Sequence, residues 1–267
     1  MNEINFPGLN LSSLYQYILL FFFASLRISS MLISSPFFST AFVPMQVRIL
    51  VSVGITAFIF PEINIPDITN LNHMKIFIII LSEIGIGLSV GLILSVLFSI
   101  AAVTGEKIAS TAGLSMANMI DPQSGGQTLV ISTVLTLFLI SIFLSLDGHL
   151  YLLKLVLESY IFLPIGMSLN ITEVSNAGIM AFGKMLYLTA LIMLPVVGGM
   201  LLINIAGGII TRSAPTLNLF SFIFPVSLVS VFIFLYLALG PIANAFSDIT
   251  GICINLIDNI LRSGGNQ

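Results

Sequence analysis

The sequence has very little charge for its length. Its 267 residues include 8 Lys or Arg and 11 Asp or Glu, so charged residues make up 7% of the chain, while hydrophobic residues make up 57%. A soluble domain carries roughly 25% charged residues. This deficit excludes a water-soluble globule and predicts surfaces that face lipid or other apolar protein. The basic residues are scattered and the net charge is -3, which excludes a nucleic-acid-binding protein.

Cysteine and histidine are also scarce, and tryptophan is absent. Cys253 is the only cysteine, so the chain can form neither an intrachain disulfide nor a cysteine metal cluster. The two histidines, His73 and His149, lie far apart in the sequence, whereas a zinc site needs three or four ligands. We therefore expect no metal, no cofactor and no catalytic residues. A membrane enzyme using Asp147 and His149 ranks last among the hypotheses because a third catalytic group is missing.

Long apolar runs occupy most of the chain. A helix needs about 20 apolar residues to cross the hydrocarbon core, and backbone polar groups in lipid must be satisfied within helices. The pattern therefore predicts an all-α, polytopic membrane protein. Its uneven segments indicate bent helical hairpins; they are residues 14–33, 49–60, 76–104, 129–146, 150–163, 180–206, 217–239 and 242–261. Glycine and proline predict breaks at Gly207-Gly208 with Pro215 and at Gly240-Pro241, and Pro195 and Pro225 predict kinks.

The last segment has an amphipathic pattern. Apolar residues recur at helical spacing along one stripe: Ile242, Phe246, Ile249, Cys253, Leu256 and Ile260. Such a helix either lies in the membrane interface or packs against protein. Packing is favoured because the basic residues that bind anionic lipid are missing.

Small residues follow one face of the third apolar run and its extension. Gly87 and Gly91 form a GxxxG pair, and Ala101, Gly105 and Ala109 continue at every fourth position. Small residues let membrane helices approach closely. This face predicts either a subunit interface or close packing within the chain, and the sequence does not separate the two.

Several charges lie inside or beside apolar runs. Each costs roughly 2.5–3.5 kcal/mol at a helix centre on insertion scales, so Arg27, Glu83 and similar residues should face protein or water. Lys154 and Glu158 are four residues apart and can pair on one helix. The alternative is a stand-alone secondary transporter with Glu83, Asp147 or Glu158 as an ion-coupling site.

One segment between the apolar runs mixes methionine with small and polar residues. It contains Gly113, Leu114, Ser115, Met116, Met119, Asp121 and Pro122 and ends in a Gly-Gly turn. A flexible segment with methionine can repack to fill irregular space, which suits a plug in a pore. An ordinary connecting loop explains the composition equally well.

Motifs in a fixed order along nearly the whole chain resemble the FliR-type export-apparatus family, called SctT in injectisomes. They are Arg27 with the run to Pro36, Val43–Arg48, Gly105-Glu106, Gly113–Ala117, Asp121-Pro122, Leu146–His149, Leu163–Gly166, Arg212–Phe220 and Phe224-Pro225. Thr216 departs from the glutamine that the family often has there. The Gly148-His149 pair and Glu106 favour the flagellar branch over the injectisome branch.

The resemblance implies a single-copy, non-catalytic subunit of a type III export gate. It implies assembly with FliP-like and FliQ-like subunits, together with a FlhB-like subunit, into a closed pore for flagellar proteins. The expected location is the bacterial inner membrane at the flagellar basal body, in contact with lipid. Residues 1–170 would be the FliP-like portion, 171–267 the FliQ-like hairpin, and about 112–128 the plug loop.

Overall fold

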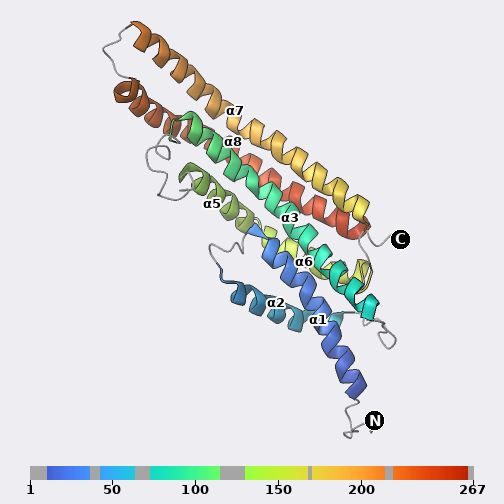
Figure 1. Ribbon diagram of the computed structural model, residues 1–267. Coiled ribbons are helices and arrows are strands. Elements are labelled where there is room, and N and C mark those ends of the chain that lie inside the picture. The colour runs from blue at the N-terminus through green and yellow to red at the C-terminus, as the bar shows by residue number, and fades with distance from the viewer. Residues whose placement is uncertain are drawn as a thin grey trace. The chain divides into compact units, whose positions relative to one another are not determined.

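The computed structural model describes residues 11–36, 43–63, 73–114, 130–167, 170–213 and 219–263. Every regular element in these ranges is a helix (Figure 1). In chain order they are α1 (Leu11–Ser34), α2 (Met45–Ile59), the short 3-10 helix η2 (Phe60–Glu62), α3 (His73–Thr111), α5 (Val130–Ser145), α6 (Gly148–Phe162), α7 (Ile171–Ser213) and α8 (Leu219–Ser263). The predicted all-helical fold is confirmed.

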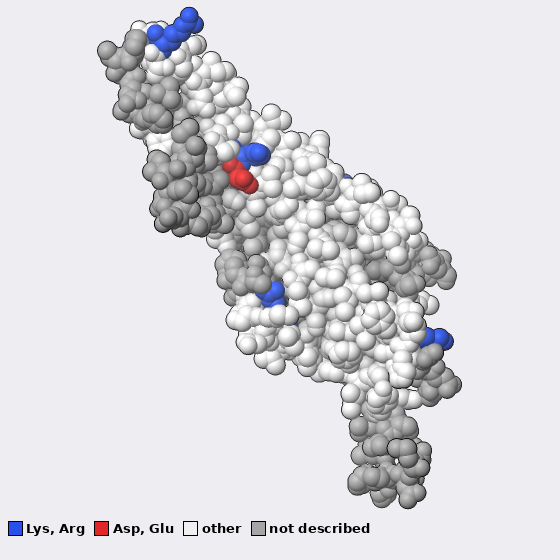
Figure 2. All heavy atoms as spheres, in the orientation of Figure 1, with Lys and Arg blue, Asp and Glu red and all other residues white. Residues whose placement is uncertain are grey.

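Four helices are long and apolar enough to cross a membrane. They contain the spans Tyr15–Ser34, His73–Thr111, Ile171–Ser213 and Ile223–Arg262, and α5 with α6 forms a fifth, bent candidate. The 15-residue α2 is too short to cross a membrane. Figure 2 shows only a few scattered charged atoms on the visible face of the described residues. The prediction of a polytopic membrane protein is confirmed.

The break predicted at Gly240-Pro241 is wrong, and the break predicted at Gly207-Gly208 with Pro215 does not fall at the two glycines, because α7 ends only two residues before Pro215. Helix α7 continues to Ser213, and α8 runs through Pro225 and Pro241 as one helix of 45 residues. A proline inside a membrane helix removes one backbone hydrogen bond, and neighbouring groups can compensate for it. At the usual rise per residue, α7 and α8 are each about 65 Å long, about twice the hydrocarbon thickness.

The chain folds into two compact units. The first contains Met1–Ser95, His149–Met180 and Cys253–Gln267; the second contains Val96–Gly148 and Ala181–Ile252. Helices α3, α7 and α8 each contribute to both. The division at residues 170 and 171 falls at the start of α7, and the identification of its two sides as FliP-like and FliQ-like stays a prediction.

In the first unit, α1 packs closely on α3 through the glycine pair. A Cβ added at Gly87 would overlap the Ser30 hydroxyl and the Arg27 carbonyl oxygen. At Gly91 it would overlap the Ser34 hydroxyl. One turn beyond Gly91, the Ser95 hydroxyl donates to the Ser34 carbonyl over 2.6 Å. Only glycine permits this approach, so the GxxxG pair packs within the chain.

In the second unit, α3 packs equally closely on α5. A Cβ at Gly105 would overlap the Ser132 backbone, and the Ser132 hydroxyl donates to the Ala102 carbonyl over 2.9 Å. Ala101 and Ala109 on this stretch are fully buried. The small-residue face is therefore occupied inside the chain over these positions, while its role at a subunit interface stays a prediction.

The amphipathic end of α8 packs against protein. All six residues of the predicted stripe are at most 7% exposed: Ile242, Phe246, Ile249, Cys253, Leu256 and Ile260. The preference for a packed helix over an interfacial one is confirmed, because the stripe has no area left for lipid.

Candidate functional site

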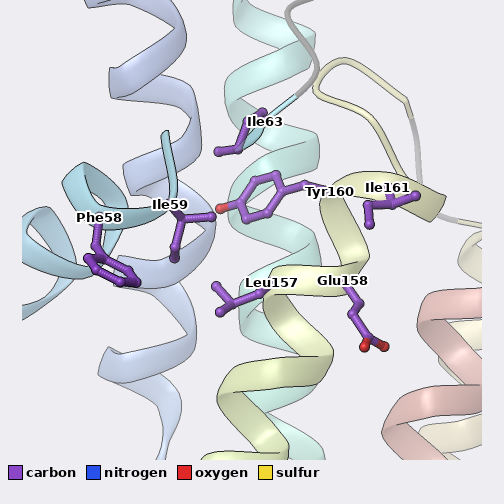
Figure 3. A pocket seen from close by; sticks show the side chains of 7 residues that line it. All are labelled: Phe58, Ile59, Ile63, Leu157, Glu158, Tyr160 and Ile161. Atoms are coloured by element: carbon purple, nitrogen blue, oxygen red, sulfur yellow. The ribbon is translucent and has the colours of Figure 1, made fainter. Parts of the chain in front are cut away.

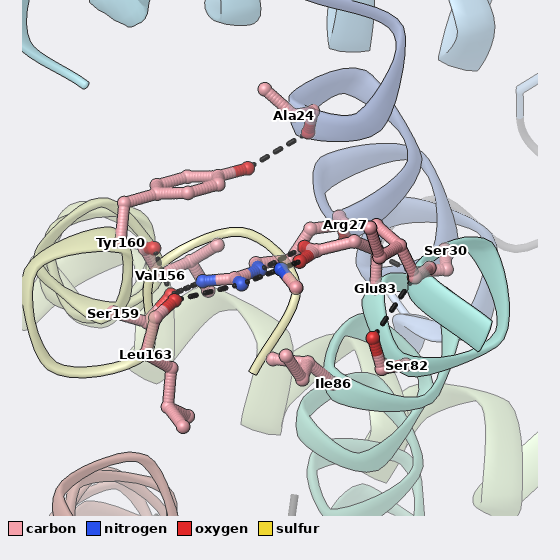
Figure 4. Close-up of polar contacts among 12 residues, drawn as sticks. Ala24, Arg27, Ser30, Ser82, Glu83, Ile86, Val156, Ser159, Tyr160 and Leu163 are labelled. Atoms are coloured by element: carbon pink, nitrogen blue, oxygen red, sulfur yellow. Dashed lines mark hydrogen bonds and ion pairs between the residues drawn. The ribbon is translucent and has the colours of Figure 1, made fainter. Parts of the chain in front are cut away.

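A buried ion pair lies at the centre of the first unit. Arg27 of α1 and Glu83 of α3 have fully buried side chains. Arg27 Nε lies 2.7 Å from Glu83 Oε2, and Arg27 Nη2 lies 3.1 Å from Glu83 Oε1 (Figure 4). Two parallel charge-assisted bonds of this kind fix both side chains in one orientation. The pair therefore joins α1 to α3.

Helix α6 and the residue directly after it supply further partners of the guanidinium. Arg27 Nη1 donates to the Ser159 hydroxyl over 2.9 Å, and Nη2 donates to the Leu163 carbonyl over 3.0 Å. The Tyr160 ring lies 4.3 Å from the guanidinium carbon, and the Tyr160 hydroxyl donates to the Ala24 carbonyl over 2.8 Å. Figure 4 shows these groups converging from α1, α3 and α6.

The turn after α6 completes the cluster on the carboxylate side. The Gly166 N–H points to Glu83 Oε1 over 3.4 Å, and Gly166 has φ +96, a conformation that glycine adopts readily. The motif from Leu163 to Gly166 thus contributes a carbonyl to the arginine and an N–H to the glutamate. We call Arg27, Glu83, Ser159, Tyr160 and Leu163 the arginine cluster.

The arginine cluster suits a structural clamp better than a reaction. A buried ion pair needs additional hydrogen bonds to offset its desolvation, and four donor contacts from the guanidinium meet that need here. Glu83 is committed to Arg27 and to the turn after α6. It is therefore poorly placed to bind and release an ion, as the transporter hypothesis requires.

The sequence predicted part of this cluster. It indicated that Arg27 and Glu83 face protein or water, and the structure brings these two together. Ser159 and Tyr160 were missed because a serine and a tyrosine in an apolar run carry no distinctive signal. The predicted pair of Lys154 and Glu158 is present at 3.7 Å on the surface of α6.

Asp147 and Glu106 lie elsewhere. Glu106 is exposed near the end of α3, and Asp147 is exposed in the turn between α5 and α6 with φ 55. The next residue, Gly148, packs under the Phe143 ring, where a Cβ would come within 2.6 Å of a ring carbon. These constraints account for the Asp-Gly motif as a tight turn.

No group of three His, Cys, Asp or Glu side chains that could hold a metal occurs within the described parts of the chain. The predicted plug falls largely outside them. Gly113 and Leu114 follow α3 and are described, whereas Ser115, Met116, Met119, Asp121 and Pro122 lie outside the described residues. The plug therefore stays a prediction.

A small cavity of about 190 Å³ lies beside the arginine cluster (Figure 3). It is lined by residues of α2 and α6 and by the residue after η2: Phe58, Ile59, Ile63, Leu157, Glu158, Tyr160 and Ile161. The lining is apolar apart from the Glu158 carboxylate and the Tyr160 hydroxyl, which is already bonded to Ala24. Such a cavity offers hydrocarbon surface to an apolar group.

Of the four long apolar helices, α7 and α8 are the least covered. Only 22% of the apolar window of α7 and 17% of that of α8 is buried, against 61% for α3. Leu202 and Leu237 are each 68% exposed, and Tyr236 is 75% exposed. Such surfaces require lipid or partner protein to cover them.

The chain is similar to known export proteins over most of its length. The sequence model of bacterial export proteins, family 1, matches residues 18–251. The flagellar biosynthetic protein FliR of Escherichia coli strain K12 is 29% identical over 250 residues, which cover 90% of this chain and 94% of that protein. FliR of Bacillus subtilis strain 168 is 26% identical over 248 residues, covering 92% and 95%. FliR of Aquifex aeolicus strain VF5 is 29% identical over 223 residues, covering 83% and 86%.

Proposed function

The chain belongs to the bacterial export proteins, family 1, and from this premise we propose that it is a non-catalytic subunit of the flagellar type III protein export gate. The relatives in Escherichia coli, Bacillus subtilis and Aquifex aeolicus are named flagellar biosynthetic proteins, which favours the flagellar gate over the injectisome. The proposed location is the bacterial inner membrane at the flagellar basal body.

The observation that carries this proposal is the uncovered apolar surface of two very long helices. Helices α7 and α8 contain 43 and 45 residues, so each is about 65 Å long and exceeds a bilayer core of about 30 Å. Apolar exposure continues along α7 from Ile179 to Ile209. A bilayer covers only part of such a helix, and partner subunits would cover the rest.

We propose FliP-like and FliQ-like subunits as those partners, with a FlhB-like subunit at the same assembly. Together they would enclose the closed pore through which flagellar proteins leave the cell. The segment from about 112 to 128 would plug the pore until a substrate arrives. The chain would perform no chemistry of its own.

Co-expression with FliP-like and FliQ-like proteins tests the proposal. The full-length chain, tagged and extracted in detergent, should co-purify with both, and native mass spectrometry should give one copy of this chain in a large complex. A monodisperse chain that leaves both proteins in the flow-through would overturn it. Deletion of residues 115–123 in the assembled complex should then raise its conductance for small ions, and an unchanged conductance would remove the plug.

A further inference from the structure

The C-terminus of α3 is closed by a glycine motif. The Gly113 N–H donates to the Ser110 carbonyl and the Leu114 N–H donates to the Ala109 carbonyl, each over 3.1 Å. Gly113 has φ +82. This is the Schellman arrangement, in which a left-handed glycine ends a helix and satisfies two of its last carbonyls. It sets the direction in which the chain leaves α3.

A side chain from α7 satisfies a further carbonyl at this end. The last carbonyls of a helix have no partner within it. Here the Asn204 amide donates from Nδ2 to the Thr111 carbonyl oxygen over 3.2 Å. Thr111 is the last residue of α3, so the contact joins the end of α3 to the C-terminal part of α7.

Helix α8 holds that amide in place. The Ser227 hydroxyl donates to Asn204 Oδ1 over 3.2 Å, and Ser227 is only 4% exposed. With Oδ1 occupied by Ser227, the amino group is directed toward Thr111. One turn earlier on α8, the Phe224 ring would lie 3.5 Å from a Cβ at Gly113. Ser227 thus contacts this junction, and Phe224 lies beside it.

The apolar surroundings of Asn204 increase the cost of breaking these hydrogen bonds. Asn204 lies on an exposed face whose neighbours Leu201, Leu202 and Ile205 are 54%, 68% and 53% exposed. When lipid or protein covers that face, water cannot replace a broken hydrogen bond. A polar side chain in such a position stabilises contacts between helices.

We infer that Asn204, held by Ser227, is a positioning residue that latches the C-terminal turn of α3 to α7 and α8. The latch keeps Gly113 and Leu114 in one place, so the end of α3 moves only when these bonds break. For its functional role the inference rests on the proposed export gate, in which the latch would hold Gly113 and Leu114, at the start of the proposed plug, in the closed state.

Thiol labelling at the latch tests the inference. In the full-length chain in bacterial membranes, Cys253→Ala removes the only native thiol and Leu114→Cys places a probe beside Gly113. Asn204→Leu removes the latch, and Ser227→Ala is the milder variant if the first fails to accumulate. We expect labelling at Leu114→Cys to quicken by about three- to tenfold, the effect of losing one or two hydrogen bonds between membrane helices.

Matched controls separate the latch from general loosening. Thr211→Val on α7 and Ser230→Ala on α8 remove hydroxyls that bond only to carbonyls of their own helix, at Gly207 and Gly208 and at Val226. Neither should change labelling at Leu114→Cys. A second probe, Ile142→Cys on α5, should label at the same rate in all variants.

The outcomes are distinct. Unchanged labelling at Leu114→Cys in both Asn204→Leu and Ser227→Ala would overturn the latch, and so would an equal rise at Ile142→Cys. Faster labelling confined to Leu114→Cys supports it. If that rise occurs while the assembled complex that carries Asn204→Leu conducts no more ions than the parent complex, the latch stands and its role in holding the proposed plug fails.

Discussion

Helix α3 and the pair α7 and α8 have nearly the same hydropathy but different surroundings. Their most apolar windows have mean hydropathies of 2.5, 2.3 and 2.3, yet 61% of the α3 window is buried and only 22% and 17% of the other two. The difference teaches that apolar composition alone does not say what covers a helix. In α3 the chain itself covers it, whereas α7 and α8 offer their surface to lipid or partners.

The buried side of α3 carries small and charged residues. Glu83 needs an internal partner, and Gly87 and Gly105 allow α1 and α5 to approach. The exposed side of α7 and α8 carries large aliphatic and aromatic residues instead. Substitutions in the two regions should therefore differ in kind as well as in size.

The largest effect is expected at the arginine cluster. Arg27→Met leaves the Glu83 carboxylate buried without its partner, and breaking a buried ion pair costs about 3–5 kcal/mol of stability. The unfolding temperature of the purified chain in detergent should fall sharply, and so should the amount of the chain in the membrane. The double variant Arg27→Met with Glu83→Leu removes the unpaired charge and should recover part of the loss.

Lys154→Met is the matched control, since it breaks an exposed pair whose side chains are 67% and 33% exposed. Such pairs contribute about 0.3–0.5 kcal/mol, so the unfolding temperature should hardly change. If the Arg27→Met protein is as stable as the Lys154→Met protein, the arginine cluster does not stabilise the packing of α3.

A smaller but clear effect is expected at the glycine contact between α1 and α3. Gly87→Ala would place a methyl group on the Ser30 hydroxyl and the Arg27 carbonyl, and overpacking of this kind costs typically about 1–3 kcal/mol. The unfolding temperature should fall. Gly85→Ala, two residues away with open space around its Cβ, should be neutral or slightly stabilising because alanine favours helix. Equal effects at the two positions would contradict the close packing.

The smallest effect on stability is expected on α7 and α8. Leu202→Ala combined with Leu237→Ala truncates two side chains that are each 68% exposed, so the isolated chain should lose no more than about 0.5 kcal/mol per site. Recovery of the complex with FliP-like and FliQ-like proteins should nevertheless drop. Leu139→Ala, at a fully buried site on α5, should do the reverse and lower the stability of the chain itself by about 2–5 kcal/mol. Full recovery of the complex from the double leucine variant would assign this face to lipid.

The sequence by itself determined the class of the molecule. The scarcity of charge, the length of the apolar runs and the ordered motifs were enough for an all-helical membrane protein of the export family, because lipid leaves the backbone few ways to satisfy its polar groups. The amphipathic stripe ending at Ile260 was also readable, because helical periodicity identifies the stripe and the lack of basic residues favours packing over the membrane interface.

Only the tertiary structure decided which residues of the chain contact one another. Arg27 and Glu83 are 56 residues apart, and the contact of Arg27 with Ser159 spans 132, so no local pattern could pair them. The same holds for Asn204, whose contacts reach α3 and α8. The continuity of α8 through Pro241 also escaped the sequence, because whether a proline ends a helix depends on what surrounds it rather than on the residue itself.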